Sequence, residues 1–251
     1  MEVRALTTGR VRQKRAGSAL RRYLADDWAE ASLPVHAFSI DHPQGLCLFD
    51  TGQTARAGEP GWFPAWYPFF RLARFELAAD DEVAVQLARL GRAPEEVRLV
   101  VLSHLHTDHV GGLDAFADAD VVVVREEWER ATGIAGRLRG YLPQRWPATV
   151  RPRLVEFNGP PLGPFRATHD LLGDGRLLLV PTPGHTPSHA SLLVRRDSGT
   201  VLLAGDFVHT AADLPAVAPD LAAWCEAEEV LLLTAHDDLV PSFVEQAEVI
   251  R

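Results

Sequence analysis

The sequence predicts an α+β fold in which two β-sheets are flanked by helices. The chain has 251 residues, 47% hydrophobic and 24% charged, so it is large enough to bury two packed sheets. Short apolar runs recur along the chain, and segments of helical character separate them. Proline and glycine are spread along the chain without a linker, repeat or low-complexity tract, which predicts one domain over residues 1–251.

The expected elements follow in a simple order. Strand patterns dominate residues 1–50, and a helix is expected near residues 81–90. Strands and helices then alternate, for example a strand over residues 121–124 and a helix over residues 126–135. Residues 219–229 leave room for a short helix, at about 3.6 residues per turn, before a last apolar run.

A cluster of histidines directly after an apolar run predicts a metal site. The run ends in Ser-His-Leu-His-Thr-Asp-His, which places His104, His106, Asp108 and His109 within six residues. Imidazole nitrogens and carboxylate oxygens are ligands of zinc, iron, cobalt and manganese. In an extended turn, alternate side chains point the same way, so His104 and His106 can hold one ion while Asp108 and His109 face a second.

Three further candidate ligands each follow an apolar run with the pattern of a strand. They are His185, Asp206 and His236. Functional side chains gather where strands end and loops begin, so we expect the four strand ends to converge on one cleft. Seven ligands shared between two ions leave room for a bridging hydroxide, which predicts a hydrolytic centre with two divalent metal ions.

This order of ligands resembles the metallo-β-lactamase superfamily, whose HxHxDH loop, later histidine, bridging aspartate and final histidine occur here in sequence. Within it the chain is most similar to the N-acyl homoserine lactonase branch over nearly its whole length. The similar segments include residues 33–52, with the Asp50-Thr51-Gly52 turn, and residues 174–186 before the third histidine. The resemblance implies an αββα sandwich.

The resemblance also implies a role for each ligand. It places His104, His106 and His185 on the first metal, Asp108, His109 and His236 on the second, and Asp206 between them. Zinc is the expected metal, and cobalt, manganese or iron are alternatives. The two cations would lower the pKa of a shared water, and Asp108 would carry a proton to the leaving oxygen unless it is a ligand alone.

Asp50 and four further histidines lie outside the predicted ligand set. Asp50 is expected to orient a ligand histidine, as the aspartate of that turn does in the family, with a simple turn former as the alternative. His189 is interpreted as structural, and His36, His42 and His169 as packed or solvated side chains.

The implied reaction is the opening of a small, partly apolar lactone such as an acyl-homoserine lactone, an activity associated with quorum quenching. Two departures from the lactonase branch affect the pocket. His209 occupies the position of a tyrosine that contacts the substrate carbonyl, and we expect it to donate a hydrogen bond there, with a solvated loop histidine as the alternative. Thr107 replaces a larger aromatic residue, which predicts a more open wall, and Phe207 is expected to contact the substrate.

Six aromatic residues in nine form a second unusual segment, over residues 62–70. Prolines interrupt it, so a regular amphipathic helix is not expected. We predict a lid or channel wall in which Trp62, Trp66 and Phe69 contact the substrate. Rings that cap the core, or a contact in a homodimer, are the alternatives.

Other functions remain compatible with the same ligands. Hydrolysis of another carboxylic ester, a thioester or a phosphotriester uses the same attack of hydroxide on an electrophile. A non-enzymatic binding protein stabilised by metal is an alternative from another class.

Charge and composition narrow the partners and the compartment. The formal net charge of −9 argues against a nucleic-acid groove, which needs a basic surface. No apolar run approaches the ~18 residues of a membrane helix, and we find no apolar region of a secretory signal, so no membrane partner is expected. The two cysteines, Cys47 and Cys225, do not suggest a disulfide framework, and we expect a cytoplasmic protein.

Overall fold

A computed structural model describes residues 1–15, 24–65, 67–133 and 136–241 and contains two β-sheets. The larger sheet has the strand order β4-β1-β2-β3-β5-β6-β7, and the smaller has the order β12-β11-β10-β9-β8. The larger sheet comprises β1 (Val3–Gln13), β2 (Leu33–His42), β3 (Gly45–Phe49), β4 (Ala73–Glu76), β5 (Val97–Val101), β6 (Asp120–Val124) and β7 (Arg153–Val155). The smaller comprises β8 (His169–Asp170), β9 (Leu177–Pro181), β10 (Ala190–Arg196), β11 (Gly199–Leu203) and β12 (Leu231–Leu233).

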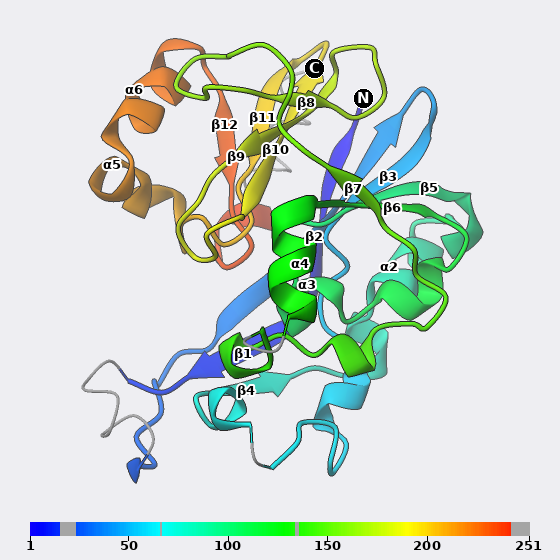
Figure 1. Cartoon of the computed structure of the whole chain (residues 1–251), viewed down its shortest axis with the longest axis vertical. Helices are drawn as coiled ribbons and strands as arrows, with labels where there is room; N and C mark the ends of the chain where they lie inside the picture. Colours follow the sequence, from blue (N-terminus) through cyan, green and yellow to red (C-terminus); the bar gives the residue numbers. More distant parts are fainter. Residues whose placement is uncertain (16–23, 66, 134–135, 242–251) are drawn as a thin grey trace.

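Helices cover the outer faces of the two sheets (Figure 1). They are α2 (Val83–Arg89), α3 (Thr107–Val110), α4 (Arg125–Thr132), α5 (Leu214–Val217) and α6 (Pro219–Ala227). Leu87 of α2 packs with residues of the larger sheet, and Leu221 of α6 packs with residues of the smaller sheet. This arrangement confirms the prediction of two sheets flanked by helices.

The alternation of side chains along each strand explains the layering. Leu179 of β9 lies in the central core, where it packs with Val101 of β5 and Ile40 of β2. The neighbouring Leu178 points the other way and joins the cluster under α5 and α6. Because successive strand residues point to opposite faces, strands that are apolar throughout can fill both the layer between the sheets and the layer under the helices.

The helix boundaries differ slightly from those that the sequence predicts. The helix expected from residue 81 begins at Val83, because Asp81 ends a short 3₁₀ turn. The helix expected over residues 126–135 runs from Arg125 to Thr132, and Gly133 continues in an extended conformation. Residues 134–135 lie outside the described residues. Helix α6 and strand β12 lie where the sequence predicts them.

The aromatic segment forms turns instead of a regular helix, as expected. The 3₁₀ turn Pro68–Arg71 lies within it, and the rings of Phe63 and Phe70 stack with centroids 4.1 Å apart. Tyr67 is fully buried and donates a hydrogen bond from its hydroxyl to the backbone oxygen of Tyr141. The segment therefore packs partly on itself and partly against the loop that follows α4.

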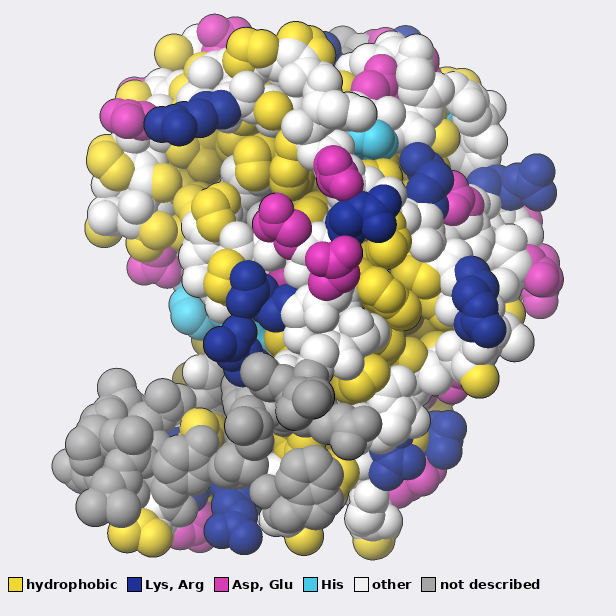
Figure 2. All heavy atoms as spheres, viewed as in Figure 1, with side chains coloured by type: hydrophobic (Ala, Val, Ile, Leu, Met, Phe, Trp, Pro, Cys, Tyr) yellow, Lys and Arg dark blue, Asp and Glu magenta, His cyan; other side chains and the backbone are white. Residues whose placement is uncertain are grey.

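Acidic and basic side chains are mixed on the surface drawn in Figure 2. Within the part of the chain that the structure describes, no helix combines the length and apolar character needed to cross a membrane.

Candidate metal centre

The seven predicted ligands lie in loops at the ends of strands. His104 and His106 follow β5, and Asp108 and His109 lie in the short helix α3. His185 lies in the β9–β10 loop, Asp206 after β11 and His236 after β12. Backbone hydrogen bonds hold these loops together. Ala190 N donates to Ser103 O at 3.0 Å, and Ala235 N donates to Gly205 O at 3.0 Å. The end of the larger sheet is thus joined to the smaller sheet beside the ligands.

The first group of ligands brings three ring nitrogens together. Nδ1 of His106 lies 3.1 Å from Nε2 of His104 and 2.8 Å from Nε2 of His185. These three side chains are one of the groups whose geometry could hold a metal ion. His104 is fully buried, whereas 31% of the His185 side chain is exposed, so the group lies at the edge of solvent.

The second group lies beside the first, and Asp206 faces both. Asp108, His109 and His236 place their ligand atoms within 4.8 Å of one another. Oδ1 of Asp206 lies 3.1 Å from Nε2 of His109 and 3.2 Å from Nε2 of His236. Its other oxygen, Oδ2, lies 3.4 Å from Nε2 of His185 in the first group. Asp206 is therefore placed to bridge the two groups.

The ring nitrogens that face away from the centre are held by acceptors. Nε2 of His106 donates to the backbone oxygen of Arg139 at 2.9 Å, and Nδ1 of His236 donates to that of Pro34 at 2.6 Å. Nδ1 of His109 donates to Oδ2 of Asp50 at 2.8 Å. Such outer partners fix the orientation of ligand histidines.

Asp50 is also linked to the ring of His104 through hydrogen bonds of Ser103. The Ser103 hydroxyl donates to Oδ2 of Asp50 at 2.7 Å, so its oxygen is left to accept from Nδ1 of His104 at 3.0 Å. The Ser103 amide donates to Oδ1 of Asp50 at 2.8 Å. Asp50 has a positive φ of 60°, a conformation that aspartate tolerates better than most residues. The structure thus places Asp50 behind one histidine of each group.

These hydrogen bonds show that the residues fit two metal ions. With their outer nitrogens donating, His104 and His106 direct lone pairs at each other across 3.1 Å, an arrangement that a cation between them stabilises. Nε2 of His109 and Oδ1 of Asp206 are buried and make no hydrogen bond, although they lie only 3.1 Å apart. Nitrogen and carboxylate oxygen in this mixture suit zinc and similar divalent ions.

The surroundings shift the pKa values of histidines in the two groups in opposite directions. Burial and the neighbouring His185 lower the pKa of His106 to about 4, and burial holds the pKa of His104 well below its usual value. Burial also disfavours charge on His109, but the carboxylates of Asp206 and Asp50 outweigh it and raise the pKa of His109 well above its usual value. The first group therefore presents neutral imidazole, the form that binds metal.

Sequence reasoning missed two residues that support the ligands. Glu127 is a fully buried carboxylate on α4, and its pKa is raised by that burial. Tyr141 lies with its ring 5.0 Å from that of His106 and donates its hydroxyl to Glu127 at 2.9 Å. Glu127 stands in an acidic run, Glu126-Glu127, that is typical of a solvated helix face, so nothing in the sequence marked it.

His189, interpreted as structural, supports Asp206, the predicted bridging residue. Its Nε2 accepts a hydrogen bond from the backbone amide of Asp206 at 3.2 Å. Gly205, with φ of +55°, allows this approach, because a Cβ there would lie 2.8 Å from that nitrogen. His36 and His42 are both buried, in keeping with a packing role.

A cavity of about 430 Å³ opens beside the ligands. His185 and Asp206 line it on one side, together with the predicted substrate contacts Phe207 and His209. The ring of the exposed His209 lies 6.2 Å from that of His236. The remaining lining comes from the segment between β11 and α5 and from α5 itself, and it consists of Val208, Asp213, Ala216 and Val217.

The other predicted substrate contacts are placed differently. Thr107 is buried, and its hydroxyl lies within hydrogen-bond distance of the Gln53 side chain, at 3.3 Å from Nε2. Trp62 is only 6% exposed, and the guanidinium groups of Arg56 and Arg145 each lie 4.6 Å from the centre of its ring. Neither residue is among those lining the cavity beside the ligands. Trp66 and the side chain of Phe69 lie outside the described residues.

Comparison with known proteins places this site in a family. The model of the metallo-beta-lactamase superfamily matches residues 32–242. The N-acyl homoserine lactonase AttM of Azorhizobium caulinodans is 34% identical over 193 residues, which are 72% of this chain and 68% of that protein. An N-acyl homoserine lactonase of a Bacillus species is 30% identical over 180 residues, 71% of this chain and 65% of that protein.

Solved structures share the fold at lower identity. An N-acyl homoserine lactone hydrolase, with the product N-hexanoyl-L-homoserine bound at its catalytic metal centre, is 22% identical with a TM-score of 0.73, and the match covers 100% of this chain and 96% of that one. AidC, a dizinc quorum-quenching lactonase, is 15% identical with a TM-score of 0.64, covering 93% and 86%. These similarities confirm the αββα sandwich.

Proposed function

The chain belongs to the metallo-β-lactamase superfamily, and on that premise we propose that it is a dinuclear lactonase that opens acyl-homoserine lactones. The names of its relatives support this substrate class. We infer zinc as the metal, because histidine and aspartate in this combination suit it. When bound, two such ions would supply hydroxide near neutral pH and polarise the substrate carbonyl.

The observation that carries the proposal is the cavity beside the ligands. Its polar wall contains His185 and Asp206, so a lactone carbonyl placed there would lie beside one ligand of the first group and beside the carboxylate that faces both groups. Its apolar wall contains Phe207 and Val217, and 58% of Val217 is exposed. An acyl chain laid along this wall would cover apolar surface that otherwise faces water.

We assign two side chains roles in moving or sharing protons during ring opening. Asp108 lies with its carboxylate oxygens 4.0 Å from His109 and His236, and we assign it the transfer of a proton to the leaving alkoxide. His209 lines the same cavity and is assigned a hydrogen bond to the substrate carbonyl. The homodimer and the cytoplasmic location stay predictions.

The test is a paired hydrolysis panel with the purified, metal-loaded protein. It contains acyl-homoserine lactones with short and long chains, an aliphatic lactone, an aryl ester, a thioester and a phosphotriester. We expect preferential opening of the acyl-homoserine lactones, lost by about 100-fold or more in Asp108→Asn. Metal content is measured alongside, because the proton-transfer role requires that the variant lose activity while it still binds two ions.

The same panel separates the alternatives. Faster turnover of the ester, thioester or phosphotriester, with the lactones inert, would contradict the substrate assignment while keeping hydrolysis at this site. No turnover of any member by protein that binds two ions would favour a metal-stabilised binding protein.

A further inference from the structure

Glu127 connects the two loops that carry the first ligand group. Its Oε1 accepts hydrogen bonds from the backbone amide of Leu105 at 3.3 Å and from the Tyr141 hydroxyl at 2.9 Å. Its Oε2 accepts from the Thr186 hydroxyl at 2.9 Å. The residue is 0% exposed, so water does not replace any of these partners.

The positions of these donors relate them to one ligand group. Leu105 lies between His104 and His106, and Thr186 directly follows His185. Every histidine of the first group is therefore adjacent in sequence to a residue bound by Glu127. The ligands of the second group have no such neighbour among the hydrogen bonds of Glu127.

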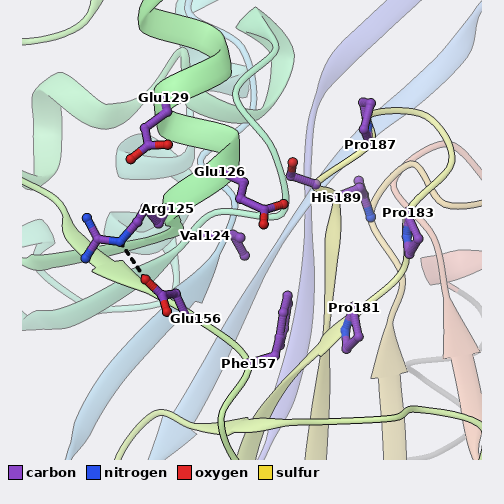
Figure 3. A pocket seen from close by; sticks show the side chains of 11 residues that line it. Val124, Arg125, Glu126, Glu129, Glu156, Phe157, Pro181, Pro183, Pro187 and His189 are labelled. Atoms are coloured by element: carbon purple, nitrogen blue, oxygen red, sulfur yellow. Dashed lines mark hydrogen bonds and ion pairs between the residues drawn. The ribbon is translucent and has the colours of Figure 1, made fainter.

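The neighbours of Glu127 on α4 have a different environment. Glu126 and Glu129 are exposed and line a separate cavity of about 600 Å³ between α4 and the β9–β10 loop (Figure 3). Arg125 forms an ion pair with Glu156 at the same cavity, with a distance of 2.8 Å. Glu127 is not among the residues lining this cavity. Three nearby carboxylates thus differ in burial and partners, which provides a matched control.

A buried carboxylate that only filled space would be costly, because desolvation disfavours its charge. Its three donors offset that cost and at the same time fix the distance between two loops from different sheets. We propose that Glu127 is a positioning residue that holds His104, His106 and His185 in the geometry of the first metal site. Its relevance to turnover rests on the proposed function, but its effect on metal binding does not.

The first experiment compares metal affinities of Glu127→Ala with those of the wild-type protein and of Glu126→Gln as the control. Cobalt is titrated into metal-free protein against a competing chelator, and the visible spectrum and bound-metal content are recorded. We expect wild type and Glu126→Gln to bind two ions alike. Glu127→Ala is expected to keep one site and to lose at least about tenfold in affinity at the other, the lower end of the effect of outer partners.

Two backgrounds identify which site is weakened. His236→Ala removes a ligand of the second group, and there Glu127→Ala should weaken the remaining binding. His104→Ala removes a ligand of the first group, and there Glu127→Ala should leave the remaining affinity unchanged. Equal weakening in both backgrounds, or in neither, would overturn the proposal.

Stability is controlled separately. The melting temperature of metal-free protein is measured for each variant, since a purely structural role would lower it without changing the ratio of the two affinities. If Glu127→Ala does not fold, Thr186→Val removes only the link to the His185 loop and should also weaken the first site, with unchanged affinity overturning the proposal. Site-selective loss of metal in a protein that opens no lactone would contradict the proposed substrate alone.

Discussion

Four of the candidate ligand histidines are each held in orientation by a hydrogen bond on the side of the ring that faces away from the metal site. Each of His104, His106, His109 and His236 has one nitrogen on the metal side and one held by a protein oxygen. The ring cannot rotate without breaking that outer bond, so the donor atoms are already arranged when metal arrives. The same chemistry also explains why the outer partners were hard to predict, because two of the four are backbone oxygens with no signature in the sequence.

At this scale, His36 predicts a dependence of stability on pH. Burial lowers the pKa of His36 to about 4, against 6.5 for the ordinary group, so between these values the unfolded chain binds more protons than the folded protein. Stability from this group is therefore fully present above pH 6.5 and decreases as the pH falls toward 4, by up to about 3 kcal/mol.

Urea unfolding of metal-free protein between pH 7.5 and 4.5 checks this prediction, with His36→Gln as the comparison. The variant is expected to be less stable at pH 7.5, because the hydrogen bond of Nε2 to Asp237 O is disturbed, but to lose less stability on acidification. Equal losses in the two proteins would show that His36 does not contribute.

At the scale of secondary-structure elements, residues at strand ends could be predicted from the sequence, whereas contacts between distant segments could not. The apolar runs before His104, Asp206 and His236 are largely buried strands. The end of such a strand fixes the position of the residue that follows it, so the pattern places these side chains. Trp62 could not be placed in the same way, since part of its environment comes from Arg145, 83 residues away. Glu127 has the same difficulty, because its donors lie in three separate segments.

Helix α5 supports a prediction about the preferred length of the substrate's acyl chain. Val217 is 58% exposed at the cavity and should contact a long acyl chain, so Val217→Asp is expected to lower kcat/KM for long-chain lactones about tenfold relative to short-chain ones. The exposed Leu90, at the end of α2, gives the matched control Leu90→Asp, which should leave that ratio unchanged. A uniform loss for all chain lengths in Val217→Asp would place the acyl chain elsewhere.

On the scale of the whole molecule, the candidate metal ligands come from both sheets. His104 and His106 follow a strand of the larger sheet, whereas His185 and Asp206 belong to loops of the smaller. Ions bound between them add connections across the sandwich that an unfolded chain lacks. The αββα arrangement was predictable from the sequence, because strand patterns and motif order indicate it, and so was the meeting of the candidate ligands at the strand ends.

Removal of metal should therefore destabilise the protein. An ion that binds only the folded state stabilises it by about 4 kcal/mol when the free ion concentration is 1,000 times Kd. In a chain of this size, that corresponds to a melting temperature higher by roughly 10 °C. Thermal unfolding with and without a strong chelator, with metal-saturated chelator as the control, measures the difference. An unchanged melting temperature after verified removal of both ions would show that the sheets hold together without them.

The distribution of ligands along the chain has a consequence for biosynthesis. Neither ligand group lies within one half of the polypeptide, because the first needs His185 and the second needs His236. His185 follows His106 by 79 residues, so a ribosome adds His185 about 4 to 16 s after His106. During that interval the nascent histidine loop is an incomplete chelate, and translation delivers the missing donors of the first ion before those of the second.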